Sequence, residues 1–307
     1  MTTIITGMSG FVGRHLARLL REKGETVEPL DVAAQCSLGK PVNLLDPDTV
    51  AEALACLQPD RIYHLAALSS VALSWKDPRQ TFAVNVDGTR NLLAAVRQHA
   101  PSARVLMVST AAVYGAAAEA GGTLHEDGEA RPANPYAESK LAAERVGEEY
   151  LRQYGIDVRR VRPQGHTGPG QAKGFVVPDL ASQIAGIAAG QAPPRIKVGN
   201  LHVRREFADV RDVVRAYQLV MEQGQPGLLC NLATNEPHSI REVAETLMEI
   251  AGVTAALVSD ETKVRPQDES SPCLDVTRIQ KLGFRFQVPF RQTLADVMAE
   301  WMGKSPA

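Results

Sequence analysis

Two side chains that can exchange a proton with a carbonyl or alcohol oxygen stand four residues apart. Tyr136 and Lys140 follow Asn134-Pro135 at the start of a helical pattern. Residues at this spacing lie on one face of a helix. A lysine ammonium beside a phenol favours the phenolate, so we expect the pKa of Tyr136 to be lowered for acid–base work. The alternative is an exposed helical face, because this spacing often occurs by chance.

Hydroxyl groups follow an apolar segment that predicts a buried strand, Val105–Val108. Ser109 and Thr110 would emerge at the carboxyl end of that strand, the edge at which open α/β sheets bind ligands. We expect Thr110 to hydrogen-bond the oxygen that Tyr136 protonates. The alternative is a helix cap or turn hydroxyl, which would be favoured for Ser109 alone.

A glycine triplet lies between the first apolar run and the first helical pattern, in the segment Gly7-Met8-Ser9-Gly10-Phe11-Val12-Gly13. Glycines in this position let the backbone approach a pyrophosphate, and the helix N-terminus supplies N–H groups and partial positive charge. The alternative is a tight strand–helix turn. The residues expected to line this part of a dinucleotide site are Gly7, Ser9, Gly10, Phe11, Val12 and Gly13.

Asp31 ends the second predicted strand, about 20 residues beyond the glycines, where an acid can bond the adenosine ribose hydroxyls. Its charge would repel the 2′-phosphate of NADP, so the sequence favours NADH. The alternative is a turn aspartate at a strand end. Asn43 and Leu44, which follow the second strand, are expected to flank the adenine.

Short strands alternate with helical patterns through the first half of the chain, which predicts parallel βαβ units in a doubly wound α/β sheet of the Rossmann type. After Pro163 this rhythm gives way to segments rich in glycine and proline. We expect a dinucleotide-binding domain at residues 1–163 and a smaller, interleaved C-terminal domain at residues 164–307. Residues from about 205 to 232 are expected to return to the first domain.

The composition is that of a globular protein: 307 residues, 44% hydrophobic, 22% charged, with a formal net charge of −2. That charge gives no reason to expect nucleic acid as a partner, and no apolar run reaches the length of a membrane span. The four cysteines are scattered without a CxxC pair, and the seven histidines form no ligand-spaced cluster, so we expect no metal. Without a secretory pattern, the sequence predicts a cytoplasmic protein.

Four segments together resemble the extended short-chain dehydrogenase/reductase family, whose members are nicotinamide-dependent enzymes of nucleotide-activated sugars. They are Thr6–Gly13, Leu65-Ala66-Ala67, Ser109–Gly115 and Tyr136…Lys140. The resemblance implies a catalytic triad of Thr110, Tyr136 and Lys140, with cofactor contacts at Leu65, Ala66, Ala67, Tyr136 and Lys140. It also implies a homodimer formed through the helices Asn85–His99 and Tyr136–Gln153.

The C-terminal half is similar to the GDP-6-deoxy-D-mannose reductases and the related GDP-mannose 4,6-dehydratases. The similarity rests on Arg162-Pro163…His166-Thr167-Gly168-Pro169-Gly170-Gln171, on Arg204-Arg205-Glu206-Phe207 and on Arg265-Pro266-Gln267-Asp268. It implies that the second domain binds a GDP-sugar, with Arg205 and Arg265 on the diphosphate. The substrate contacts that the resemblance implies are Ser69, Thr110, Val177, Asn200, Arg205 and Arg265.

Two positions depart from these relatives. Gln164-Gly165 stands where they have Phe-Asn, which removes an asparagine expected to contact the substrate near its pyrophosphate. Ala112 stands where the dehydratases have a glutamate that serves as acid and base. An alanine cannot move a proton, so the sequence disfavours dehydration.

The resemblance therefore implies reduction of the 4-keto group of GDP-4-keto-6-deoxy-D-mannose to GDP-D-rhamnose by hydride from NAD(P)H. Two alternatives stay open. An NAD-dependent sugar-nucleotide 4-epimerase would use the same three residues but retain its cofactor. A non-catalytic nucleotide-sensing protein would keep the fold and lose the chemistry, which the change at Gln164-Gly165 allows.

Overall fold

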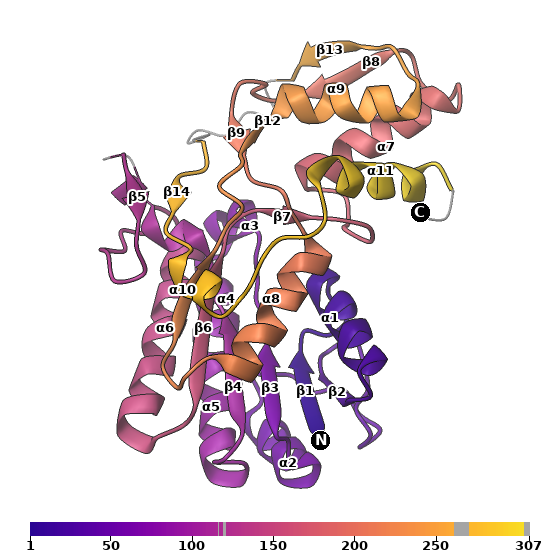
Figure 1. Cartoon of the computed structure of the whole chain (residues 1–307). Helices are drawn as coiled ribbons and strands as arrows, with labels where there is room; N and C mark the ends of the chain where they lie inside the picture. Colours follow the sequence, from indigo (N-terminus) through magenta and orange to yellow (C-terminus); the bar gives the residue numbers. More distant parts are fainter. Residues whose placement is uncertain (116, 119–120, 261–269, 304–307) are drawn as a thin grey trace. The chain divides into compact units, whose positions relative to one another are not determined.

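The computed structural model describes residues 1–115, 117–118, 121–260 and 270–303, and the chain divides into two compact units (Figure 1). Unit 1 comprises Met1–Pro163, Val214–Leu232 and Pro272–Arg285. Unit 2 comprises Gln164–Val213, Ala233–Ser271 and Phe286–Ala307.

Unit 1 is built on a six-stranded parallel sheet with the strand order β11-β6-β4-β3-β1-β2. The chain runs from β1 outward to β2 and then crosses to β3 on the other side of β1. The carboxyl ends of β1 and β3 therefore form the topological switch point at which such sheets bind ligands. The strands are β1 (Thr2–Thr6), β2 (Thr26–Leu30), β3 (Arg61–His64), β4 (Arg104–Val108), β6 (Val158–Pro163) and β11 (Leu229–Leu232).

Helices α2, α5 and α6 share one apolar core with alternate residues of the strands, including Ile4, Ile62 and Val105, which are fully buried. Of the six strands, β4 and β11 are mainly apolar, as expected for strands buried on both faces, whereas β6 is fully buried yet carries three arginines. The helical elements of unit 1 are α1 (Phe11–Glu22), α2 (Pro47–Leu57), α3 (Val71–Lys76), α4 (Pro78–Phe82), the π-helical turn η1 (Ala83–Asp87), α5 (Gly88–His99), the 3₁₀ turn η2 (Ala111–Tyr114), α6 (Pro135–Tyr154) and α10 (Thr277–Lys281).

Local sequence sets the ends of α6. The Asn134 side chain caps the helix by accepting a hydrogen bond from the Ala137 N–H at 2.9 Å, and Pro135 occupies the first helical position. Gly155 ends the helix in the left-handed conformation. The helix predicted to begin at Asn85 instead opens with η1, a π-helical turn of the kind often found at functional sites.

In unit 2, three helices pack around an apolar core of their own, which includes Ile184, Leu247 and Leu294. They are α7 (Val176–Ala188), α9 (Ile240–Ala251) and α11 (Phe290–Trp301). Three short strand pairs complete the unit. These are β7 (His166–Thr167) with β10 (Ala208–Asp209), β9 (Arg204–Arg205) with β12 (His238–Ser239), and β8 (Arg195–Val198) with β13 (Ala256–Ser259).

The chain returns to unit 1 twice after Pro163. The first return begins within α8 (Val210–Gln223) and includes β11. The second, Pro272–Arg285, has no counterpart in the sequence prediction, and it pairs β14 (Cys273–Leu274) in parallel with β5 (Thr123–Leu124). Among the described helices, we find none of the length and apolar character that a bilayer span requires.

Candidate active site

The glycine segment forms a tight turn after β1. Gly7 has φ +69°, and a Cβ atom on it would lie 2.9 Å from the Cα and N atoms of Ala66. A Cβ atom on Gly13 would lie 2.6 Å from the carbonyl oxygen and 2.7 Å from the Cα atom of Met8. The missing side chains thus let the first turn of α1 close onto the loop, which directs a helix N-terminus toward the switch point. This backbone fits a dinucleotide pyrophosphate.

Asp31 lies where the predicted ribose-binding acid belongs, at the end of β2. Its side chain is 8% exposed. Its Oδ2 accepts a hydrogen bond from the Ser9 N–H at 2.7 Å and its Oδ1 from the Ala33 N–H at 2.9 Å. Asp31 therefore joins the glycine loop to β2 and keeps its carboxylate beside the turn.

The two residues predicted to flank the adenine have different environments. Asn43 is exposed, and its Oδ1 accepts a hydrogen bond from the Leu45 N–H. Leu44 is 6% exposed and packs in the core of unit 1, so its side chain contributes to the fold.

A buried hydrogen-bond chain holds the loop that follows β3. The Thr6 hydroxyl accepts from the N–H groups of Leu65 and Ala66, at 3.1 and 3.0 Å. With both lone pairs used, the hydroxyl donates its own proton to Nδ1 of His64 at 2.8 Å. The Leu65-Ala66-Ala67 backbone predicted to contact the cofactor is fixed to β1 in this way.

The hydrogen bonds of His64 define its tautomer. Thr89 donates its hydroxyl proton to the Asn85 carbonyl at 2.7 Å, so it accepts from Nε2–H of His64 at 2.8 Å. Burial, together with the charge of Lys140, lowers the pKa of His64 to about 3. His64 is therefore a neutral structural link at physiological pH.

The Asn85 side chain joins this loop to α6. It accepts from the Leu68 N–H at 2.8 Å and donates to the Leu68 carbonyl at 3.2 Å and to Ser139 Oγ at 2.9 Å. Ser139 in turn donates to the carbonyl of Tyr136 at 2.7 Å. Asn85 thus fixes the distance between the loop and the helix that carries Tyr136 and Lys140.

The structure brings the predicted triad together. Tyr136 and Lys140 lie one turn apart on α6, and Thr110 is the extended residue that caps η2. Burial raises the pKa of Tyr136, and hydrogen bonding with Thr110 opposes this rise. The predicted lowering of this pKa is wrong, because burial of the phenol outweighs the hydrogen bond with Thr110.

Lys140 is 9% exposed. Burial lowers its pKa to about 8, and the charge of Glu144 opposes this change. The ammonium form therefore predominates below pH 8, while Tyr136 keeps its phenolic proton. This pair of protonation states suits donation of a proton to an oxygen substrate.

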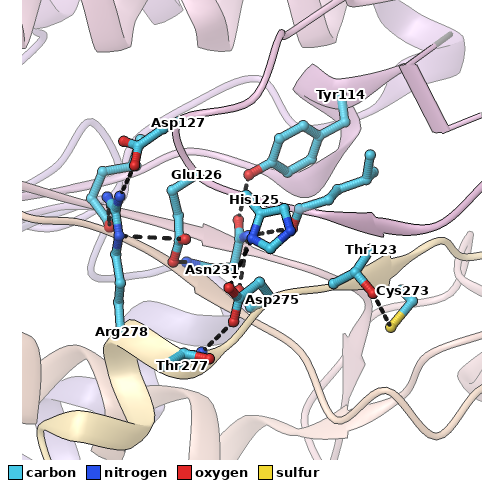
Figure 2. Close-up of polar contacts among 12 residues, drawn as sticks. Tyr114, Thr123, His125, Glu126, Asp127, Asn231, Cys273, Asp275, Thr277 and Arg278 are labelled. Atoms are coloured by element: carbon cyan, nitrogen blue, oxygen red, sulfur yellow. Dashed lines mark hydrogen bonds and ion pairs between the residues drawn. The ribbon is translucent and has the colours of Figure 1, made fainter.

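A polar cluster supports the segment that follows Thr110 (Figure 2). Tyr114, at the end of η2, donates its hydroxyl proton to Asn231 Oδ1 on β11 at 2.7 Å. The Asn231 N–H donates to Glu126 at 2.9 Å, and Arg278 forms ion pairs with Glu126 and Asp127. Arg278 belongs to the second return of the chain, Pro272–Arg285, which thus helps to hold η2 in place after Thr110.

The model of the family described as GDP-mannose 4,6-dehydratase matches residues 4–297. The chain belongs to this family. Its sequence is 34% identical, over 97% of this chain and 96% of the relative, to a GDP-6-deoxy-D-mannose reductase from Pseudomonas aeruginosa. It is 28% identical, over 95% and 94% of the two chains, to a GDP-L-fucose synthase from Escherichia coli.

Solved structures agree with this assignment. The RMD protein of Pseudomonas aeruginosa, complexed with NADPH, superposes with a TM-score of 0.88 at 34% identity, covering 98% of this chain and 99% of the other. A UDP-glucose 4-epimerase from Thermus thermophilus, in complex with NAD, gives 0.86 at 29% identity and 99% coverage of both chains. The predicted Rossmann fold is confirmed. The prediction that the chain is an NAD(P)-dependent oxidoreductase acting on nucleotide sugars is also confirmed.

The predicted substrate contacts are distributed over both units. Ser69 is exposed in the loop after β3 of unit 1. In unit 2, Arg205 lies on β9, and Asn200 Oδ1 accepts a hydrogen bond from the His202 N–H. Val177 is 1% exposed within the core of unit 2, so its side chain is a packing residue. Arg265 lies outside the described residues.

The family departure at Gly165 has a steric basis. Its carbonyl accepts a hydrogen bond from the Ala208 N–H at 3.0 Å, next to the β7–β10 pair. A Cβ atom at this position would overlap the carbonyl oxygen of Glu206. The asparagine that the resemblance predicts at this position would not fit this backbone.

Sequence reasoning missed several residues of the site, because each acts through a partner distant in sequence. Asn85 was noted only as the start of a helix. Glu144 reads as an ordinary charge on a helix, and Asn231 stands in an apolar strand without a motif around it. For Glu144, a charged residue at a helix position predicted to be buried would have been a signal; the sequence offers none for Asn85 or Asn231.

Proposed function

We propose that the chain reduces the 4-keto group of GDP-4-keto-6-deoxy-D-mannose to GDP-D-rhamnose with NAD(P)H. The observation that carries this proposal is the group formed by the partly buried Thr110 and Tyr136 and the buried Lys140, in a chain that has a glycine turn after β1 and alanine at position 112. The similarity to the Pseudomonas reductase supports the substrate.

Each residue of the triad has a defined task in this reaction. Tyr136, a phenol that is protonated at neutral pH and whose pKa burial raises further, donates a proton to the oxygen at C4. Thr110 orients that oxygen by a hydrogen bond. Lys140 supplies positive charge that stabilises the phenolate left behind. A nicotinamide held by the glycine turn, Asp31 and the Leu65–Ala67 loop would supply the hydride.

Ala112 makes dehydration the less favourable reaction. The neighbouring Thr110 uses its Oγ1 to accept the Ala112 N–H at 3.2 Å, so the turn places a methyl group at position 112 beside the triad residue. Loss of water from a sugar needs an additional acid and base, whereas reduction needs one proton from Tyr136.

For the cofactor we propose a preference for NADH over NADPH. The buried carboxylate of Asp31 would repel a 2′-phosphate, and the seven residues after it, Val32–Leu38, include no lysine or arginine. A reductase with this preference should show a higher kcat/KM for NADH than for NADPH.

We also propose that unit 2 binds the GDP moiety through Arg205 and Arg265, and that the chain forms a homodimer through α5 and α6. The guanidinium of Arg97 on α5 lies 4.0 Å from the centre of the Tyr154 ring on α6, so the two helices contact each other within one chain. A monomer in analytical ultracentrifugation would contradict the dimer.

The compartment is a separate proposal. All four cysteines are free, which supports action in a reducing compartment such as the cytoplasm.

The decisive experiment adds GDP-4-keto-6-deoxy-D-mannose to the protein with NADH or NADPH and identifies the sugar product by NMR. Stoichiometric cofactor oxidation with formation of GDP-D-rhamnose would support the proposal. Conversion of an unreduced GDP- or UDP-hexose without net oxidation would instead support a 4-epimerase. Cofactor binding without turnover on any sugar nucleotide would support a sensing role.

The variant Tyr136→Phe tests the assignment of the proton donor. Removing the hydroxyl should reduce turnover by about 10²- to 10⁴-fold, the usual contribution of general acid catalysis. A thermal unfolding midpoint equal to that of wild type serves as the control for correct folding, because Tyr136 is itself an expected cofactor contact. Turnover within a factor of two of wild type would exclude Tyr136 as the donor.

A further inference from the structure

Glu144 is a buried carboxylate one helical turn beyond Lys140 on α6. It is 2% exposed. Its Oε1 accepts from Nε of Arg162 at 2.9 Å and its Oε2 from Nη2 at 2.7 Å, a bidentate pair. The Ser109 hydroxyl also donates to Oε1. Charged side chains are rarely buried to this degree unless they are paired, so Glu144 depends on Arg162 and Ser109 as its partners.

The first link from Glu144 to the active site runs through the backbone. Ser109 immediately precedes Thr110, and its N–H donates to the Val161 carbonyl at 2.8 Å. The Ser109 hydroxyl therefore fastens the carboxyl end of β4 to α6. Because Thr110 directly follows Ser109 and Tyr136 lies on α6, this bond helps to set the distance between Thr110 and Tyr136.

The second link is electrostatic. Glu144 and Lys140 are four residues apart on α6 and both are buried, so they lie on the same helical face. The other titratable groups around Lys140 are His64 from β3, which is neutral, and Tyr136 from α6, which is protonated. The charge of Glu144 favours the ammonium form of Lys140.

Arg162, on β6, keeps the Glu144 carboxylate in place. Its guanidinium lies 4.9 Å from the centre of the Tyr114 ring, and its Nη1 donates to the Glu126 carbonyl at 3.3 Å. Tyr114 and Glu126 belong to the polar cluster of Figure 2. Arg162 is thus fixed from three sides, and so is the carboxylate it binds.

We propose that Glu144, braced by Arg162, is a positioning residue of the active site that places Thr110 through Ser109 and keeps Lys140 in its ammonium form. For its activity readout this inference rests on the proposed reductase function. The competing explanation is that the Glu144–Arg162 ion pair only connects α6 to β6. A purely structural ion pair can be replaced by two apolar groups of similar volume without a change in the pH dependence of activity.

Two variants separate these explanations. Glu144→Gln removes the charge and leaves Arg162 buried without its partner, which also threatens folding. The double variant Glu144→Gln/Arg162→Met removes both charges and preserves the volume. In folded Glu144→Gln, the proposal predicts that the alkaline limb of kcat/KM moves by about one pH unit to lower pH, because Lys140 loses its proton earlier. In the double variant the shift should have the same direction but be smaller, because loss of the positive charge of Arg162 opposes it.

The matched control is Glu148→Gln. Glu148 lies one turn further along α6 and pairs with Arg160 of the same strand β6, but its side chain is 55% exposed. The same chemical change there should leave the pH profile unchanged. Ser109→Ala should lower turnover by up to about 100-fold, since misplacement of a reacting group has effects of this size, while the alkaline limb stays in place.

A pH titration of NADH binding by nicotinamide fluorescence gives a readout that needs no sugar substrate. Affinity should fall with rising pH as Lys140 is deprotonated, and the fall should begin about one pH unit lower in Glu144→Gln. An alkaline limb of Glu144→Gln that coincides with wild type, in binding and in turnover, would overturn the proposal and leave a purely structural ion pair. If that variant does not fold, unchanged turnover in Ser109→Ala overturns the proposal. Absence of turnover with a shifted binding curve would reject the reductase function alone.

Discussion

Replacing Gly13 by alanine tests whether the close approach of α1 to the loop after β1 is what forms the dinucleotide site. A methyl group there would lie 2.6 Å from the Met8 carbonyl oxygen and 2.7 Å from its Cα atom. Ordinary contacts between such atoms are about 3.5 Å, so the loop or the helix must move by about 1 Å. The neighbours are backbone atoms, which cannot rotate away.

Overpacking of this kind destabilises by about 1–3 kcal/mol. If the loop moves to relieve the overpacking, it must return to its original position to bind the cofactor, and binding is weakened by the same free energy. We therefore expect the dissociation constant for NADH to rise about 5- to 150-fold, at 1.4 kcal/mol for each tenfold change. The assay is a titration of NADH fluorescence at constant pH and ionic strength.

The matched control is Gly186→Ala in α7 of unit 2. A Cβ atom there would meet Ala192 Cβ at 3.9 Å, an ordinary contact, and alanine favours the helix. This variant should bind NADH as wild type does. The reasoning would be refuted if Gly13→Ala also bound NADH within a factor of two of wild type.

Three further results are expected. Because burial lowers the pKa of Lys140 to about 8, kcat/KM for NADH should fall as the pH rises through 8, when the ammonium loses its proton; a plateau from pH 7 to 10 would contradict this. Gly165→Ala should destabilise unit 2 by about 1–3 kcal/mol because its methyl group would overlap the Glu206 carbonyl oxygen, and an unchanged urea denaturation curve would show that the backbone yields. Thr89→Val should destabilise unit 1 by about 1–3 kcal/mol by leaving Nε2–H of His64 without an acceptor, and the same denaturation measurement tests it against wild type.

Features encoded by adjacent residues could be predicted from the sequence. The glycine turn, Asp31 at the end of a strand, and Tyr136 with Lys140 on one helix each follow from a local pattern and a local rule. The alternation of strands and helices likewise predicted the parallel sheet, because each βαβ unit is short and continuous in sequence.

Features that depend on distant segments were not predictable in this way. Cys273 pairs with Thr123 across 150 residues, and nothing in either two-residue strand signals the other. The predicted direction of the pKa shift of Tyr136 was wrong, because the shift depends on how deeply the folded chain buries the phenol. The four-residue spacing of Tyr136 and Lys140 carries no information about that burial. The pairing of Glu144 with Arg162 required the fold for the same reason.

The chain passes between its two units at five points, after Pro163, Val213, Leu232, Ser271 and Arg285. Neither unit is one continuous stretch of sequence, so a single recombination event cannot exchange one for a homologous module. Exchange of either unit for a homologous one therefore requires several crossovers, which makes substitution within the existing chain the simpler route to a change in either unit. A chimera that grafts residues 164–307 from a relative would also replace β11 and α10 of unit 1, so its properties could not be assigned to unit 2 alone.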